Sequence, residues 1–231
     1  MEEITTWSKS IFFLLNGSDS LYLDGVFWTI TRTVTWVPLM LITLYIVVKN
    51  NGWRRALLPI AVVLLLICFT DQFSSSFCKP FFRILRPTHD PSTATMVDIV
   101  NGYRGGLYGF FSSHAANTFA CATFLSLLFR SWSVSAFLYI YAFLCSLSRI
   151  YLGVHSPIDI GVGTLFGLLS GALFYFLYYL ADKRFGQPRT FFSSAYTASG
   201  YLYSDLVLIH LGFALTLLYV AFNAVFLAAS Y

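Results

Sequence analysis

Long apolar runs alternate with short polar segments along most of this chain. Six runs approach the roughly 20 mostly apolar residues that an α-helix needs to cross a bilayer. They occupy residues 26–48, 56–76, 114–129, 134–147, 158–180 and 206–229. The third and fourth runs are short and need flanking residues to span. The pattern predicts a chain that crosses the membrane about six times.

An additional apolar segment precedes the first run. The stretch WSKSIFFLLNGSDS (residues 7–20) is too short to span and is interrupted by Asn16-Gly17, so it favours an interfacial helix. We therefore predict an all-α, polytopic membrane helix bundle with about six transmembrane helices and an amino-terminal interfacial helix. Residues 1–231 are expected to form a single membrane-embedded domain, with the longest connections at 72–113 and 181–205.

Composition supports a membrane protein and disfavours several other classes. Hydrophobic residues make up 58% and charged residues 10% of the chain, against about a quarter charged in soluble domains. The net charge of +4 is spread over loops, so no nucleic-acid partner is expected, and no obligate protein partner is predicted. The four cysteines are scattered, which predicts neither a disulfide nor a zinc site.

Lysine and arginine in short loops predict the orientation, because such residues favour the cytoplasmic side. Three loops are then cytoplasmic, and they carry Lys49, Arg54 and Arg55; Arg130; and Lys183, Arg184 and Arg189. The two remaining loops face outward and carry Lys79, Arg83, Arg86, Arg104 and Arg149. Because positive charge on that side opposes the rule, we interpret it as retained for chemistry.

The first outward cluster is KPFFRILRP, residues 79–87. Pro80 suits the first turn of a helix, on which Arg83 and Arg86, three residues apart, would share a face. Arginine can grip phosphate with two hydrogen bonds, and Lys79 would add a point charge. The alternative is a cationic belt that binds anionic lipid headgroups.

The second cluster is FSSHAAN, residues 111–117, where a helix is expected to begin. Small residues at a helix amino terminus leave backbone N–H groups free, and these form an anion site at Ser112 and Ser113. The alternative is that a serine is only an N-cap and that His114 is an interfacial histidine without a role.

The third cluster is SRIYLGVHSPID, residues 148–159. Ser156-Pro157 resembles an N-cap followed by proline, so a helix should begin just after His155. Asp159 would then accept a hydrogen bond from the His155 ring and make the opposite ring nitrogen a nucleophile. Arg149, across a turn at Gly153, would hold the oxygens of the electrophile. The alternative is an Asp-His pair that only closes a helix end.

Together these motifs resemble the signature of the type 2 phosphatidic acid phosphatase superfamily, the membrane relatives of the vanadium haloperoxidases. Its first part, Lys, six residues, Arg-Pro, is matched by Lys79 and Arg86-Pro87. Its third part is matched by Ser148-Arg149, His155 and Asp159 with the family's spacing. The resemblance covers roughly residues 71–180, and the run 206–229 would be an additional carboxy-terminal transmembrane helix.

The middle part departs from the family's Pro-Ser-Gly-His, because Phe111 replaces the proline and Ser113 the glycine. The resemblance implies that His155 is the nucleophile, that Asp159 orients it and that His114 protonates the leaving group. It also implies a phosphoryl site that needs no metal or cofactor, formed by Lys79, Arg86, Ser112, Ser113 and Arg149. Arg83 is added to that site from helical spacing alone.

The resemblance implies a lipid phosphate or diphosphate phosphatase, acting on a membrane-anchored substrate at the outer leaflet. We expect it in a bacterial inner membrane with its active site facing the periplasm. Undecaprenyl diphosphate is the first expected substrate and lipid A the second; phosphatidylglycerol phosphate and phosphatidic acid stay open. A haloperoxidase-like enzyme and a lipid-binding or flipping protein are the competing hypotheses, and an oriented His155-Asp159 pair counts against the latter.

Overall fold

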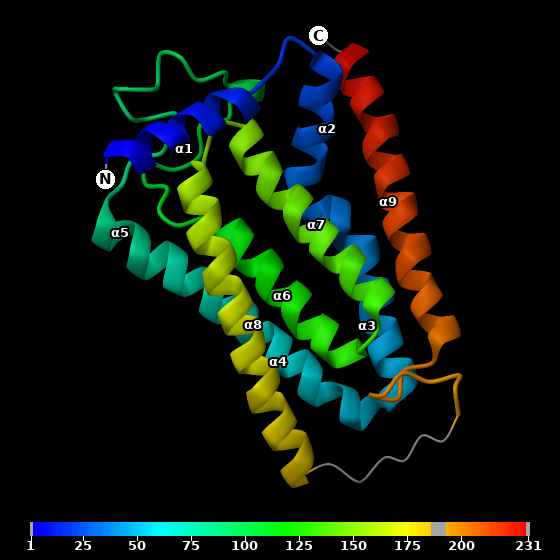
Figure 1. The fold of residues 1–231 in the computed structure, drawn as a ribbon. Helices are drawn as coiled ribbons and strands as arrows, with labels where there is room; N and C mark the ends of the chain where they lie inside the picture. The colour runs from blue at the N-terminus through cyan, green and yellow to red at the C-terminus, as the bar shows by residue number, and fades with distance from the viewer. Residues whose placement is uncertain (1, 186–192, 230–231) are drawn as a thin grey trace.

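The computed structural model of the chain describes residues 2–185 and 193–229, which form an all-helical bundle without β-strands (Figure 1). The elements are α1 (Glu2–Leu15), α2 (Leu21–Thr31), α3 (Thr33–Asn51), α4 (Trp53–Gln72), the π-helix η1 (Phe73–Cys78), α5 (Lys79–Phe82), the 3-10 helix η2 (Val100–Gly102), α6 (Ser113–Phe129), α7 (Trp132–Tyr151), α8 (Pro157–Phe185) and α9 (Tyr203–Ala229). The predicted all-α fold is confirmed.

Five helices among the described residues are long and apolar enough to cross a membrane. They cover Thr33–Asn51, Trp53–Phe82, Trp132–Tyr151, Pro157–Arg184 and Tyr203–Ala229. The sixth predicted span, α6, has 17 residues and packs between α4, α7 and α8. About six membrane-crossing helices therefore account for the bundle.

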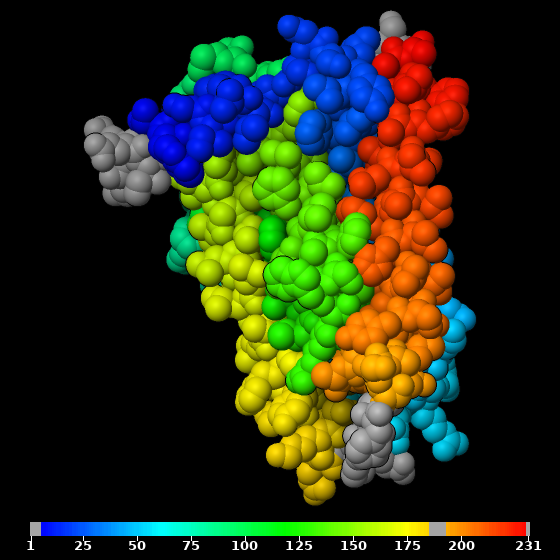
Figure 2. Space-filling view, turned by 45° about the vertical axis from the view of Figure 1, so that its right-hand side comes forward, coloured from blue at the N-terminus to red at the C-terminus, as the bar shows by residue number. Residues whose placement is uncertain are grey.

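Helix α1 lies across one end of the bundle, where it packs on α7 and α8 (Figures 1 and 2). Its Phe12 is buried, whereas Trp7 and Leu14 are exposed. An exposed tryptophan beside apolar side chains is typical of a helix in the interfacial layer.

The first predicted span is broken, so a single helix over 26–48 is wrong. At Arg32 the backbone is extended (φ −78°, ψ 124°), and it separates α2 from α3. The carbonyls of Thr29 and Ile30, freed by the break, accept hydrogen bonds from Thr35 Oγ1 (2.6 Å) and Trp36 Nε1 (2.8 Å). Side chains of α3 thus satisfy the broken end of α2, as buried backbone groups require.

The second predicted span is longer than expected. Helix α4 continues through the π-helix and α5 to Phe82, and Arg83 ends it with a left-handed backbone (φ 51°). The prediction of a helix that begins near Pro80 and carries Arg83 and Arg86 on one face is therefore wrong. Arg86 lies beyond the helix end.

The predicted cytoplasmic loops gather at one end of the bundle, opposite α1 (Figure 1). The α3–α4 and α6–α7 connections and the end of α8 lie there, with Lys49, Arg54, Arg55, Arg130, Lys183 and Arg184; Arg189 lies outside the described residues. An ion pair between Lys49 Nζ and Asp205 Oδ1 (2.6 Å) joins α3 to α9 at this end. The segment 83–112 and the α7–α8 turn lie at the α1 end.

A stripe of glycines lets α8 approach α6 closely. An added Cβ on Gly163, Gly167 or Gly171 would lie 2.5–2.6 Å from a backbone carbonyl oxygen of residues 112–120. Small residues at such positions allow backbone-to-backbone packing inside a membrane. This packing sets the distance between the amino-terminal ends of the two helices.

We expect Gly167→Ala to separate α6 from α8, because its Cβ would meet Ala116 O at 2.5 Å. Overpacking of this kind costs about 1–3 kcal/mol. The thermal unfolding midpoint of the detergent-purified variant should fall by several degrees. Gly161→Ala, on the same helix with nothing within 4 Å, is the control and should leave the midpoint unchanged or raise it. Equal midpoints for both variants would contradict the packing role.

Candidate active site

The third cluster forms a tight turn between α7 and α8. Gly153 has a positive φ of 74°, and a Cβ there would lie 2.5 Å from Val97 Cγ1, so glycine is required. Ser156 caps α8, because its Oγ accepts the Asp159 N–H at 3.2 Å. Helix α8 begins at Pro157 as predicted. The turn holds His155 at the end of the bundle with only 1% of its surface exposed.

The contacts of His155 define its tautomer. Arg86 Nη1 lies 3.2 Å from His155 Nε2. Because a guanidinium has only donors, Nε2 must accept and the ring proton is assigned to Nδ1. Burial lowers the pKa of His155 well below its usual value, and the charges of Arg86 and Arg149 lower it further. The neutral ring therefore presents a lone pair at Nε2.

The Asp159 carboxylate faces the other side of the imidazole. Its Oδ2 lies 3.5 Å from His155 Nδ1, slightly beyond hydrogen-bond distance, and accepts the Ser156 N–H at 2.8 Å. Asp159 is buried, with 4% of its surface exposed. The two side chains of the expected pair therefore lie next to each other, with the Asp159 carboxylate facing His155 Nδ1.

Two buried arginines stand beside the imidazole. Arg149, in the last turn of α7, is 3% exposed, and Arg86 is 8% exposed. Arg86 Nη1 donates to Val154 O (3.2 Å) as well as to His155. The Nε–H of each arginine is buried without a partner among the described residues. Buried donors without acceptors are costly, and an oxyanion between the two side chains would satisfy them.

Backbone pairing within the 83–112 segment places Arg86. Its N–H donates to Leu107 O (3.1 Å), and the Gly109 N–H donates to Ile84 O (2.9 Å). Gly109 also faces the site, because a Cβ there would contact Arg86 Cγ at 3.2 Å and Asp159 Oδ2 at 3.3 Å. The segment 83–112 therefore packs against the Arg86 side chain and holds it next to the start of α8.

Lys79 approaches from α5, at the end of the π-helical turn. Its Nζ donates to Ser113 Oγ (3.3 Å) and Ser75 Oγ (3.4 Å). A π-helical turn in an α-helix is frequent at functional sites. Because an ammonium has three N–H donors, these two bonds leave one for a ligand.

A polar network continues from this point along α4 and α6. Asn117 Nδ2 donates to Asp71 Oδ1 (3.3 Å), and Thr70 Oγ1 donates to Asn117 Oδ1 (2.6 Å). Asp71 also attracts Lys79 electrostatically. These contacts fix the helix that carries Lys79 against the start of α6.

The second cluster starts α6 as predicted. Ser112 Oγ accepts the Ala115 N–H (3.4 Å), and the Ser112 N–H donates to Asp159 O (3.1 Å). Ser112 therefore caps α6 and joins it to α8. Ser113 and His114 supply first-turn N–H groups, which an α-helix leaves without intrahelical partners. The His114 ring interacts electrostatically with Arg149, His155, Lys79 and Arg86.

The two departures in the middle motif have structural explanations. Phe111 is 3% exposed, and its ring packs against Phe166 (5.0 Å between centroids) and Phe73 (6.5 Å). Ser113 is the first helical residue of α6, so it needs no glycine-only conformation. Its hydroxyl adds a partner for Lys79.

Arg83 is not brought to the cluster. Its side chain is exposed, and Nε donates to Pro80 O at 3.2 Å. Sequence reasoning also missed two partners of Arg149, Thr31 and Tyr103, since neither carries a recognisable motif. Asp71 could have been flagged, because a carboxylate inside an apolar run is rarely without a role.

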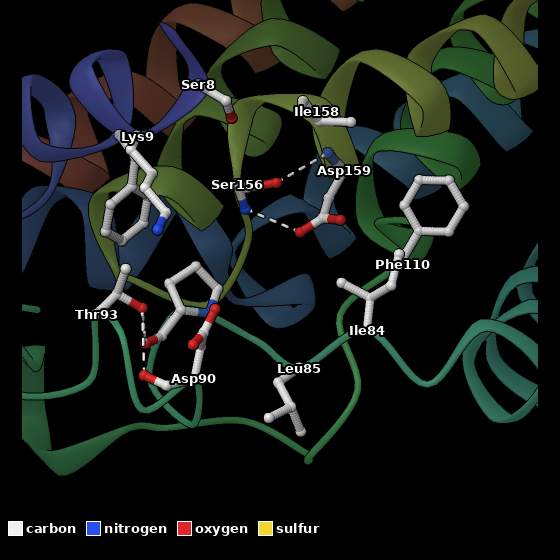
Figure 3. A pocket seen from close by; sticks show the side chains of 12 residues that line it. Ser8, Lys9, Ile84, Leu85, Asp90, Thr93, Phe110, Ser156, Ile158 and Asp159 are labelled. Atoms are coloured by element: carbon white, nitrogen blue, oxygen red, sulfur yellow. Dashed lines mark hydrogen bonds between the residues drawn. The ribbon is translucent and has the colours of Figure 1, made fainter. Parts of the chain in front are cut away.

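A cavity of about 250 Å³ lies on the other side of Asp159 (Figure 3). Its lining comes from α1, from the segment that carries Arg86 and from the start of α8, and it includes Lys9, Ile84, Leu85, Asp90, Phe110, Ser156, Ile158 and Asp159. His155, Lys79 and Arg149 are not among its lining residues. The cavity therefore adjoins the candidate active site but does not contain its cationic centre.

Comparisons with known proteins agree with the resemblance to the type 2 phosphatidic acid phosphatase superfamily. The pattern of the PAP2 superfamily matches residues 56–185. A Lipid A 4'-phosphatase of Bacteroides thetaiotaomicron is 40% identical over 178 residues, 77% of this chain and 79% of that protein. A Lipid A 4'-phosphatase of Porphyromonas gingivalis is 40% identical over 191 residues, 80% of this chain and 78% of that protein.

A solved structure is also similar. The crystal structure of Aquifex aeolicus LpxE superposes with a TM-score of 0.54 at 26% sequence identity, covering 71% of this chain and 92% of that one. The helical membrane bundle with clustered histidines and cations, together with these matches, defines an integral membrane phosphatase. The chain belongs to the PAP2 superfamily, and it is a membrane lipid phosphatase of that type.

Replacing the two arginines of the first motif, Arg86 and Arg83, should have very different effects on kcat/KM. Arg86→Ala removes a buried donor that contacts His155, and we expect kcat/KM to fall by about 10²–10³-fold. Arg83→Ala removes an exposed side chain and should change kcat/KM by less than about threefold. Phosphate release by the purified variants measures both. A large loss of kcat/KM in Arg83→Ala, with an unchanged melting midpoint, would show that Arg83 is part of the active site after all.

Proposed function

We propose that this protein hydrolyses a phosphate monoester of a lipid A-type substrate and releases inorganic phosphate, with His155 as the nucleophile. The observation that carries the proposal is the convergence of Lys79, Arg86 and Arg149 on a neutral His155. Two buried Nε–H groups there have no partner among the described residues. Fixed donors around a nucleophile are what phosphoryl transfer requires.

The first step forms a phospho-histidine. His155 Nε2 attacks phosphorus in line with the departing oxygen, and Arg86 Nη1 moves from Nε2 to a phosphoryl oxygen. The ring then carries positive charge, which the Asp159 carboxylate stabilises from 3.5 Å. The negative charge of the bound phosphoryl group offsets the surrounding cations, so that His114 is protonated in the substrate complex, and it gives this proton to the sugar alkoxide as the P–O bond breaks. The products of this step are the dephosphorylated lipid and the phospho-enzyme.

The second step returns the enzyme to its starting state. His114, now neutral, takes a proton from a water molecule that attacks phosphorus, and the P–N bond to His155 breaks. Inorganic phosphate leaves. Three cations and the first-turn N–H groups of α6 supply the positive potential in both steps, so we propose that no metal ion takes part.

The proposed substrate is inferred from the two similar proteins described above. Both proteins with 40% identity are named as lipid A 4'-phosphatases, and each is matched over more than three quarters of its length. This favours lipid A over undecaprenyl diphosphate, reversing the order of preference that the sequence alone suggested. Phosphatidylglycerol phosphate and phosphatidic acid have no comparable support.

We further propose an inner-membrane location with the site facing the periplasm. The lysines and arginines at the end opposite α1 favour the cytoplasm. The cations at the α1 end do not count equally against this orientation, because Arg86 and Arg149 are buried and hydrogen bonded. Their role in the site explains why positive charge is kept on the translocated side.

Purified protein should release inorganic phosphate from lipid A in the presence of EDTA. Mass spectrometry of the product should show the loss of one phosphate, and His155→Ala should abolish it. Undecaprenyl diphosphate, phosphatidylglycerol phosphate and phosphatidic acid are assayed in parallel. More than tenfold faster turnover of one of these would assign the enzyme to that substrate, and binding without release from any of them would indicate a lipid-binding protein.

His114→Ala should affect a monophosphate more than a diphosphate. A monophosphate lipid expels an alkoxide whose conjugate acid is about as weak as water, with a pKa near 15.7. Losing the acid should slow that reaction by about 10²–10⁴-fold. A diphosphate expels a phosphate group whose second pKa is about 6, so it needs the proton far less. Equal losses on lipid A and undecaprenyl diphosphate would show that His114 only binds the phosphoryl group.

A further inference from the structure

We infer that Thr31 and Tyr103 are positioning residues, which clamp the Arg149 guanidinium so that its remaining N–H groups face the phosphoryl group. The inference rests on the proposed function, because it assigns Arg149 to the phosphoryl site. Neither residue belongs to the three motifs. One lies at the end of α2, and the other follows η2 in the segment 83–112.

The clamp has two arms. Arg149 Nη1 donates to Thr31 Oγ1 at 2.6 Å, and Nη2 donates to the Tyr103 hydroxyl at 3.2 Å. The guanidinium carbon also lies 5.4 Å from the centroid of the Tyr103 ring, within cation–π distance. Of the five N–H donors of an arginine, these bonds use one on each terminal nitrogen. Nε–H and one N–H on each terminal nitrogen are left for a ligand.

The break in the first span holds Thr31 in place. Thr31 is the last residue of α2, directly before the extended Arg32. The bond from Trp36 Nε1 to Ile30 O fastens the same turn from α3, and Trp36 is 2% exposed. The extended Arg32 lets the start of α3 fold back so that Trp36 reaches this carbonyl, and the last turn of α2 is held where the Thr31 hydroxyl meets α7.

Aromatic packing holds Tyr103. Its ring meets Trp28 edge to face, with 5.7 Å between centroids, and it packs on a buried cluster that contains Val100, Leu152 and Val154. Val154 directly precedes His155. Burial raises the pKa of the Tyr103 phenol, but the positive charges of Arg149 and Arg86 outweigh this effect and lower it below its usual value. The hydroxyl is thus held in the field of the cationic site.

The expected role is geometric. A long arginine side chain that loses one arm keeps its charge but samples more orientations. Misplacing a catalytic group by about 1 Å can slow a reaction by about 10²-fold. Because the fork must match the phosphoryl oxygens most closely in the transition state, loss of an arm should lower kcat more than it raises KM.

The test replaces each arm with a residue of the same shape. Tyr103→Phe and Thr31→Val should each lower kcat about tenfold with less than a threefold change in KM, and should weaken inhibition by vanadate by a similar factor. Thr31→Ser keeps the hydroxyl and should restore most of the rate. A higher KM with an unchanged kcat, or an unchanged kcat in both variants, would overturn the inference.

Matched controls separate positioning from packing. Tyr151→Phe removes a buried phenol hydroxyl that bonds Asp24 and Ser18 (both 2.7 Å) and does not contact Arg149. Thr216→Val removes a buried hydroxyl that bonds only a carbonyl within α9. Both controls should keep kcat within about twofold. If Tyr151→Phe slows turnover as much as Tyr103→Phe, the effect is one of packing and the clamp is refuted.

A double-mutant cycle gives the decisive measurement. In an Arg149→Lys background, which has no guanidinium to clamp, Tyr103→Phe should cause no further loss of kcat, whereas independent roles would multiply the two losses. Stabilisation of the protein by vanadate, measured as a shift of its melting midpoint, provides a readout that does not need turnover. A wild-type protein that binds vanadate but hydrolyses no lipid would refute the proposed function alone. Multiplying losses in an active enzyme, or equal vanadate shifts in Tyr103→Phe and wild type, would refute the clamp alone.

Discussion

Close contact between α6 and α8 is the constraint on which the site depends. Gly163, Gly167 and Gly171 leave no side chain between α8 and the backbone of α6. The bond from the Ser112 N–H to Asp159 O then joins the first turns of the two helices. One helix end carries His114 and the other is preceded by His155. The proposed nucleophile and the proposed acid are therefore positioned by a backbone contact, whose geometry is more rigid than that of two long side chains.

The second constraint is burial of positive charge. A lysine and two arginines around a neutral histidine repel one another in a poorly hydrated place. Burial of His155 lowers its pKa, and the three positive charges lower it further. The arrangement is unfavourable in the absence of an anion, and the binding of a phosphoryl group, as proposed, would offset the repulsion. Since electrostatic interactions strengthen as water is excluded, the same burial would increase the stabilisation of a phosphoryl transition state. A soluble surface cluster of the same charges would lack this advantage.

Sequence spacing predicted the parts of the site that local geometry determines. His155, Ser156, Pro157 and Asp159 lie within one turn and one helix start, so capping rules alone place them correctly. Arg83 was misplaced because a left-handed residue ends α5, and a lone arginine gives no local signal for that conformation. The break at Arg32 was missed because hydropathy averages over it: the residues on either side stay apolar enough for one continuous span.

Long-range partners could not be predicted for a different reason. Thr31 and Tyr103 are 118 and 46 residues from Arg149, and no periodicity relates an α2 end to a loop segment. What they share with the other anchors becomes visible only in the fold. Lys79 is held by the hydroxyls of two serines, Arg149 by a threonine and a tyrosine hydroxyl, and Arg86 by a carbonyl and the imidazole.

Neutral acceptors therefore anchor all three cations, and no carboxylate is hydrogen bonded to any of them among the described residues. A paired carboxylate would hold a cation equally well but would cancel its charge and compete with the substrate. Hydroxyl anchors orient the donors and leave the positive charge available. The serine that replaces the family's glycine at position 113 extends the same arrangement. Its hydroxyl gives Lys79 one more neutral anchor, while the backbone N–H of Ser113 lies in the first turn of α6, has no intrahelical partner, and can donate to the phosphoryl oxygens of the proposed substrate.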